Sequence, residues 1–303
     1  MTPSGARFAW VLNLDAEFEL AREGYAPRAK LLAQLEQYGR DSRRLLGPDD
    51  VLVSAGPGSS ELMRLPEGCK EGLIGRAWCP TPRALSELAA VGIEPEPHPE
   101  ASVLRRVNHR RFAFELGGGL EGQRYLERKE ELDSELRRAR APLLLKRPLA
   151  FAGRGQLRVY AHARITEKEW SWIDASLRAD GLIVEPLVEP SLELSLHGFL
   201  WRDGHFELGH ACLQDVSERG VFRGLRRANL DELAERERTA LFEQGNRVAV
   251  ALSGAGYFGP FGIDAYRYRR GDQHAFCALS EINARYTMGF VTGFPRHPRE
   301  LAL

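Results

Sequence analysis

Short apolar runs alternate with helical stretches through the first hundred residues. The runs at 8–14 and 73–78, and a short run that begins at Val51, have the length of buried strands. The periodicity of residues 26–46 and 82–91 predicts helices, the first of which ends at a Gly-Pro pair. Strands that alternate with helices in this way indicate a small, mostly parallel α/β lobe.

The pattern changes after residue 100, where charged residues interleave with a sparse apolar stripe. The predicted elements are linking helices at 101–116 and 123–139, strands at 143–146 and 157–160, and helices at 167–179 and about 230–251. The helix at 167 begins with the spacing of a capping box, in which Glu169 follows Thr166. We therefore expect an α/β chain whose C-terminal part has α+β character.

The segment from 258 to 285 reads as an antiparallel hairpin with its turn near Gly271. Because side chains alternate across a strand, Glu281 and Asn283 project from one face, and Asp264 can project beside them from the partner strand. Carboxylates this close repel unless a cation lies between them, and ligation by oxygen alone suits magnesium better than zinc or copper. The alternative is that both carboxylates are solvated and paired with nearby arginines.

An apolar strand that ends in Lys146 opens into a loop with Gly153, Arg154 and Gly155. Such a loop can present consecutive backbone N–H groups to an anion, and the lysine adds a mobile positive charge. This combination favours phosphate. The same loop could equally be a plain hairpin turn, and the sequence contains no G-x-x-x-x-G-K-[ST] motif.

Polar and apolar residues alternate between 192 and 200. Glu193, Ser195 and His197 share a face opposite three leucines, which is typical of a half-buried strand. The polar face of a cleft is therefore expected here. The alternative is an ordinary strand with an exposed glutamate.

The composition mainly excludes several classes of binding partner and site. The 303 residues include 42 Lys and Arg and 42 Asp and Glu, so no overall field favours nucleic acid or an anionic membrane. The four cysteines are irregularly spaced without a C-x-x-C pair, which argues against a zinc knuckle and a disulfide framework. No apolar run approaches the roughly 18 residues of a membrane span, and no secretory leader is recognisable. A cytoplasmic protein is expected.

Three of these elements together resemble the ATP-grasp superfamily. The closing segment Ala-x-Glu-Ile-Asn-Ala-Arg, which contains Glu281 and Asn283, is similar to the magnesium-binding motif of that superfamily. Along the chain, Lys146 with its glycine loop comes first, the segment at Glu185 comes second, and this closing segment comes last. Their order and approximate spacing are similar to those of that fold. The resemblance covers residues 107–288 and implies binding of ATP and Mg²⁺.

The resemblance also implies roles for individual residues. The candidates for nucleotide binding are Arg110, Lys146, Gly153, Arg154, Gly155, Glu185, Leu187, Val188 and Glu193. Within this set Arg110, a position more often occupied by lysine, would contact phosphate with Lys146. The segment that starts at Glu185 would lie along adenine through backbone groups, and Glu193 would bind the ribose hydroxyls.

The metal ligands and the catalytic cations follow from the same resemblance. The implied magnesium ligands are Asp264, Glu281 and Asn283. Many ligases of the superfamily have an arginine just ahead of the metal aspartate, where this chain has Phe261 and Gly262. Arg285 is therefore the candidate for stabilising the transition state, together with Lys146.

Three regions are expected on this basis. Residues 1–106 are similar to the pre-ATP-grasp domain, residues 107–188 would form the small lobe with the glycine loop, and residues 189–303 would form the large lobe with the magnesium site. Four arginines at 219, 223, 226 and 227 flank a predicted loop. They are candidates for receiving an acidic substrate, or else form a solvated face.

The implied reaction is ligation of a small-molecule carboxylate to an amine. The carboxylate attacks the γ-phosphate of ATP, and the amine then captures the resulting acyl phosphate. Two alternatives stay open: a kinase with the same fold, and a nucleotide-binding module without catalysis. A homodimer is one candidate assembly.

Overall fold

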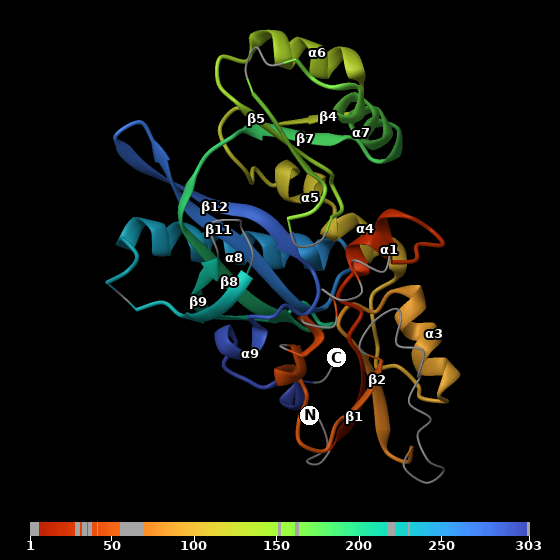
Figure 1. Ribbon diagram of the computed structural model, residues 1–303. Coiled ribbons are helices and arrows are strands. Elements are labelled where there is room, and N and C mark those ends of the chain that lie inside the picture. Colours follow the sequence, from red (N-terminus) through yellow and green to blue (C-terminus); the bar gives the residue numbers. More distant parts are fainter. Residues whose placement is uncertain are drawn as a thin grey trace.

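The computed structural model describes residues 6–27, 31, 35, 38–40, 42–54, 70–150, 153–160, 164–216, 222–229 and 231–301. Their strands form three sheets of three, four and five strands, one in each of three lobes. Figure 1 shows the five-stranded sheet between the other two lobes.

The first lobe, named the N-lobe, contains the predicted parallel sheet. Its strands are β1 (Arg7–Val11), β2 (Val51–Ser54) and β3 (Leu73–Ala77), in the order β2-β1-β3. Its helices are α1 (Ala16–Ala21), the 3-10 turn η1 (Arg43–Leu45) and α3 (Pro82–Ala90). The sequence pattern misses α1, because six residues are too few to show a helical period.

The helix predicted at 26–46 is tested only in part. Positions 31, 35, 38–40 and 42 are helical, whereas residues 26 and 27 are not. The remaining positions before η1 lie outside the described residues.

Both predicted linking helices are divided. Residues 101–116 form α4 (Ala101–Asn108) and α5 (Arg110–Glu115), because the backbone at His109 is extended. In the second segment β4 (Arg124–Leu126) precedes α6 (Lys129–Arg138), so the prediction of one helix over 123–139 is wrong. The strand forms because it pairs with a partner more than fifty residues away, which local periodicity does not show.

The second lobe, named the loop lobe, is a four-stranded antiparallel sheet in the order β4-β7-β5-β6. Its other strands are β5 (Leu143–Lys146), β6 (Gln156–Val159) and β7 (Leu182–Pro186). Helix α7 (Glu167–Ala179) has the predicted start, where the Thr166 hydroxyl accepts the Glu169 N–H and the Glu169 carboxylate accepts the Thr166 N–H. Trp170 and Trp172 of this helix both pack against the core of the lobe.

The central sheet is antiparallel, in the order β10-β9-β8-β11-β12. Its strands are β8 (Pro190–Leu200), β9 (Phe206–Val216), β10 (Phe222–Arg227), β11 (Gly259–Arg270) and β12 (Gln273–Asn283). The predicted hairpin is confirmed as β11–β12, and Gly271 in its turn has a positive φ of 62°. The elements that follow are α9 (Phe290–Gly293) and the 3-10 turn η2 (Pro298–Glu300).

Helix α8 (Glu235–Gly254) packs on the apolar face of the central sheet. Gly245 lies so close to Leu196 of β8 that a Cβ there would approach its side chain to 2.8 Å. The helix starts five residues later than predicted. The Glu232 carboxylate does accept the Asn229 N–H at 2.7 Å, but this bond closes a separate turn before the helix.

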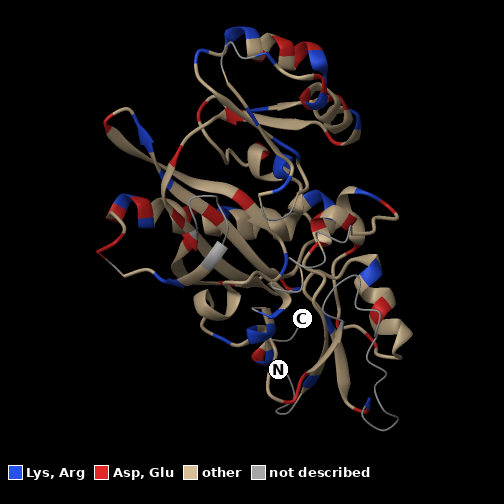
Figure 2. Ribbon diagram, viewed as in Figure 1, with Lys and Arg blue, Asp and Glu red and all other residues tan. Residues whose placement is uncertain are grey.

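The N-lobe and the central sheet share one hydrophobic core. Trp10 of β1 contacts Tyr286, which follows β12, at 5.1 Å between ring centroids. Arg76 of β3 is buried and donates to the carbonyls of Pro298 (2.6 Å) and Leu301 (2.9 Å). Charged residues of both signs are interspersed in the view of Figure 2. Among the described helices none is long and apolar enough to cross a membrane.

Candidate nucleotide and metal site

The hairpin brings the three predicted metal ligands together. Asp264 and Glu281 are directly opposite each other in the β11–β12 ladder. The amide of Asn283 donates to Asp264 Oδ2 at 2.9 Å, and the amide of Gln214, on β9, donates to Asp264 Oδ1 at 3.0 Å. Gln214 was not predicted. Its strand, β9, is separated from β11 by β8, and the local sequence of β9 does not show this order of strands.

Burial controls the electrostatics of this cluster. Desolvation, with the charge of Glu281 as a second cause, raises the pKa of Asp264 to about 7. The hydrogen bonds from Asn283 and Gln214 oppose that rise in pKa. A cation between the two carboxylates would relieve the same repulsion. Among the described residues no group of three His, Cys, Asp or Glu side chains could hold a metal, so any site here depends on the amide of Asn283.

Arg110 connects this cluster to the loop lobe. Its guanidinium donates to Glu281 Oε1 at 2.7 Å and to the carbonyl of Arg147 at 2.6 Å. Arg147 directly follows β5, and α5 lies between the two sheets in Figure 1. The side chain predicted to contact phosphate therefore holds a carboxylate and a backbone carbonyl.

Arg285 lies on the other side of the cluster, toward the N-lobe. Its Nη2 donates to Asn283 Oδ1 at 2.9 Å, and the guanidinium forms an ion pair with Glu17 of α1. The guanidinium carbon is 5.5 Å from the centroid of the Trp78 ring. Sequence reasoning identified Arg285 but not Glu17, whose helix it did not detect.

Lys146 and Glu185 form an ion pair with an Nζ–Oε1 distance of 2.5 Å, and both side chains are largely buried. They extend from β5 and β7 of the loop lobe. Of the next residues in the predicted adenine segment, Leu187 donates its N–H to the carbonyl of Pro142 at 2.9 Å, and Val188 is packed against a small apolar cluster. The Leu187 N–H is thus committed to the protein.

The two glycines in the loop after β5 share a backbone conformation but differ in their surroundings. Both Gly153 and Gly155 have positive φ, 70° and 72°, which favours glycine. A Cβ on Gly155 would lie 2.8 Å from the Cβ of Ala150, whereas one on Gly153 would meet nothing within 4 Å. Burial raises the pKa of Tyr25 in the N-lobe, and the positive charge of Arg154 opposes that rise.

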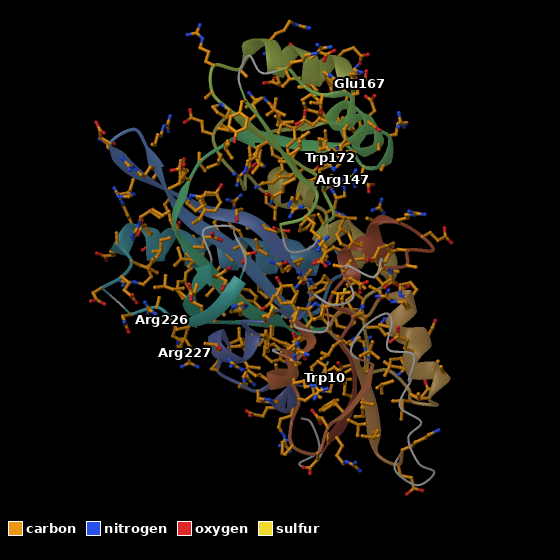
Figure 3. The ribbon with its side chains drawn as sticks, in the orientation of Figure 1. Trp10, Arg147, Glu167, Trp172, Arg226 and Arg227 are labelled. Atoms are coloured by element: carbon orange, nitrogen blue, oxygen red, sulfur yellow. The ribbon has the colours of Figure 1, made fainter. Side chains whose placement is uncertain are left out.

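The sequence interpretation did not single out Arg147, whose carbonyl accepts a hydrogen bond from Arg110. The Nε of Arg147 donates to Ser176 Oγ at 2.8 Å, and its guanidinium lies 4.8 Å from the centroid of the Trp172 ring. Figure 3 shows Arg147 and Trp172 beside each other. Burial lowers the arginine pKa. The only local signal was its position directly after Lys146.

The predicted polar face of β8 is present, but only Glu193 remains half-exposed, with its pKa raised by burial. The expectation of an open cleft is wrong for Ser195 and His197, which are both buried. The ring nitrogens of His197 lie 3.1 Å from Ser195 Oγ and 3.0 Å from Thr287 Oγ1. Gly293 of α9 packs directly on the ring, and burial lowers the His197 pKa to about 4.

Of the four candidate arginines, the two whose side chains are described make contacts outside the metal cluster. Arg226 forms an ion pair with Glu232, and Arg227 donates to the carbonyl of Thr292 at 2.8 Å. Figure 3 shows both at the β10 end of the central sheet. Arg219 and the side chain of Arg223 lie outside the described residues.

No protein-family model and no curated protein matches this chain. Among solved structures, D-alanyl-alanine synthetase A from Vibrio cholerae has a TM-score of 0.57 at 14% identity, over 99% of this chain and 94% of that one. Biotin carboxylase from Campylobacter jejuni, in a β,γ-ATP complex, gives 0.58 at 12% identity over 95% and 67%. N5-carboxyaminoimidazole synthetase from Staphylococcus aureus, complexed with ADP, gives 0.53 at 11% identity over 93% and 71%. Likeness at such identities is likeness of fold.

Proposed function

We propose that this chain, which has the ATP-grasp fold, is an ATP- and magnesium-dependent carboxylate–amine ligase. The observation that carries the proposal is the chain of contacts through Arg110. It joins the loop lobe, with the Lys146–Glu185 pair, to the cluster of Asp264 and Glu281 in the central sheet. The nucleotides bound to two of the similar structures support ATP as the co-substrate.

The donor set of the cluster fits magnesium. Two carboxylates and an amide oxygen are hard oxygen ligands, and Mg²⁺ usually completes its octahedron with water and phosphate oxygens. In this structure Arg110 donates to Glu281 and Arg285 donates to Asn283, so a metal would compete with two guanidinium groups for these oxygens. The arginines so released could turn toward the phosphates. Bound there, Mg²⁺ would neutralise charge on the phosphates.

The reaction needs no side-chain nucleophile. A carboxylate oxygen of the acid attacks the γ-phosphorus, the bond to the β–γ bridging oxygen breaks, and ADP leaves. The amine nitrogen then attacks the acyl carbon, a C–N bond forms, inorganic phosphate leaves and the nitrogen loses a proton. In this proposal Lys146, Arg110 and Arg285 stabilise the negative charge that moves between these oxygens.

The nucleotide would be held by the remaining predicted residues. The N–H groups of the loop at 153–155 would face the phosphates. The backbone from Glu185 to Val188 would lie along adenine through groups other than the Leu187 N–H, and Glu193 would accept from the ribose hydroxyls.

A thermal-shift titration with Mg²⁺ and ATP tests the nucleotide site, followed by phosphate release against pooled amino acids and small acids. Asp264→Ala combined with Glu281→Ala should abolish both responses. Asp272→Ala, in the exposed turn of the same hairpin, is the matched control and should change neither. Intact turnover in the double variant would refute the metal assignment. A stable phosphorylated product in place of phosphate and an amide would indicate a kinase instead.

A further inference from the structure

Arg147 directly follows β5 and joins the glycine loop to two helices. Its N–H donates to the carbonyl of Gly155 at 2.8 Å, which closes the base of the loop. Its carbonyl accepts from Arg110 of α5 at 2.6 Å, and its Nε donates to Ser176 Oγ of α7 at 2.8 Å. The backbone and the side chain of this one residue therefore hold the loop to different elements.

The side chain of Arg147 lies between the loop and α7. Successive residues of an extended chain face opposite sides of a sheet, so Arg147 packs on α7 whereas Lys146 pairs with Glu185. A Cβ on Gly155 would lie 3.3 Å from Arg147 Cβ and 3.6 Å from Cδ, so the apolar stem is in contact with the loop. At the other end the guanidinium lies over the Trp172 ring (Figure 3). A rigid support for the loop is the result.

Stability alone does not account for an arginine at this place. The side chain is half-buried, burial lowers the pKa of the guanidinium, and no carboxylate among the described residues opposes that change. Removing a charge from water without a counter-charge costs free energy, whereas an apolar side chain on Trp172 would avoid that cost. A charge that its surroundings disfavour is a candidate for a role in function.

We propose that Arg147 is a positioning residue for the phosphates of the nucleotide, because it fixes the base of the glycine loop whose N–H groups would face them. The inference rests on the proposed ligase function and adds a residue to its nucleotide site. Ser176 belongs to the same arrangement: its hydroxyl accepts from Arg147 and donates to the carbonyl of Trp172 at 2.7 Å, which orients it. Neither side chain touches the nucleotide in this proposal.

Arg147→Met keeps most of the stem and removes the guanidinium. Calorimetry with Mg²⁺ measures the affinities for ATP and for adenosine, which has no phosphates, and thermal unfolding measures the midpoint. The affinity for ATP should fall about tenfold, and the affinity for adenosine should change less than about twofold. The midpoint should stay unchanged or rise, because a half-buried charge is removed. Arg178→Met, at an exposed position near the end of α7, is the matched control and should change none of these properties.

The comparison of the two ligands separates positioning of the loop from a general structural role. A residue that only stabilised the lobe would affect ATP and adenosine alike. An equal loss of affinity for both ligands, or an unchanged affinity for ATP, would therefore overturn the inference. If the natural chain bound neither ligand, the proposed function itself would be refuted.

Ser176→Ala tests the same contact from its other end and is the milder change if Arg147→Met folds poorly. It should lower the affinity for ATP about threefold and leave the affinity for adenosine unchanged. In a double-mutant cycle the combined variant should lose no more affinity for ATP than Arg147→Met alone, because both changes remove one contact. Additive losses would mean that the two residues act independently, which contradicts the inference.

Discussion

Asp264 faces Glu281 in a partly buried cluster, and its raised pKa makes the carboxyl proton part of the site. The pKa of about 7 means that a fraction of the chains carries a neutral carboxyl near physiological pH. Because a metal ligand must be deprotonated, Mg²⁺ has to displace that proton, and its affinity should increase as the pH rises through 7.

Asp264→Asn should remove a pH-dependent loss of stability. The carboxyl keeps its proton to about pH 7 in the folded chain, whereas its ordinary pKa is 3.8. Between these values the folded state binds more protons than the unfolded state, so the free energy of unfolding falls as the pH rises. Urea titrations from pH 5 to 8 should therefore show the natural chain losing stability relative to the variant. Parallel pH profiles would contradict the assignment of this proton to Asp264.

Arg110→Ala leaves Glu281 without its guanidinium and the Arg147 carbonyl without a donor. Because Glu281 is about a third exposed, we expect a loss of about 1 to 3 kcal/mol in the free energy of unfolding, below the cost for a fully buried pair. The apparent affinity for ATP should fall as well. Arg106→Ala, on the exposed side of α4, is the control. Equal effects of the two variants on ATP affinity would count against a phosphate role for Arg110.

At the scale of elements, the loop after β5 provides a matched pair of glycines. Gly153→Ala and Gly155→Ala both place a Cβ in the left-handed region, which costs about 1 to 2 kcal/mol. Only at residue 155 does the new Cβ also meet Ala150. Chemical denaturation should therefore show the larger loss for Gly155→Ala, with a larger increase in KM for ATP. A larger effect at residue 153 would mean that the loop is arranged differently.

Sequence reasoning succeeded where the deciding contacts are local. Alternation along β11 and β12 was sufficient to place Asp264 and Glu281 on one face, and the Thr166 cap fixed the start of α7. It failed where distant strands decide: β4 is a strand because β7 lies beside it, and Gln214 reaches Asp264 from two strands away. The burial of His197 likewise depends on α9, nearly a hundred residues later.

For the whole molecule, the Glu17–Arg285 ion pair joins the N-lobe to the end of β12. Glu17→Gln keeps the shape but leaves a buried guanidinium without its counter-charge, which costs about 3 to 5 kcal/mol. We expect a lower unfolding midpoint and faster limited proteolysis between the lobes. Glu23→Gln, at an exposed position after α1, should change neither property. If Glu17→Gln behaved like this control, the pair would have no part in joining the lobes.

Arg76 has a consequence for how the chain is made. Its two carbonyl partners, at Pro298 and Leu301, follow it by 222 and 225 residues. At about 5 to 20 residues per second, a ribosome needs about ten to forty seconds to deliver them. Until then the guanidinium of Arg76 lacks these two carbonyl acceptors. A chain that ends before residue 298 lacks both acceptors, so we expect it to unfold more readily and to be cleaved faster by proteases.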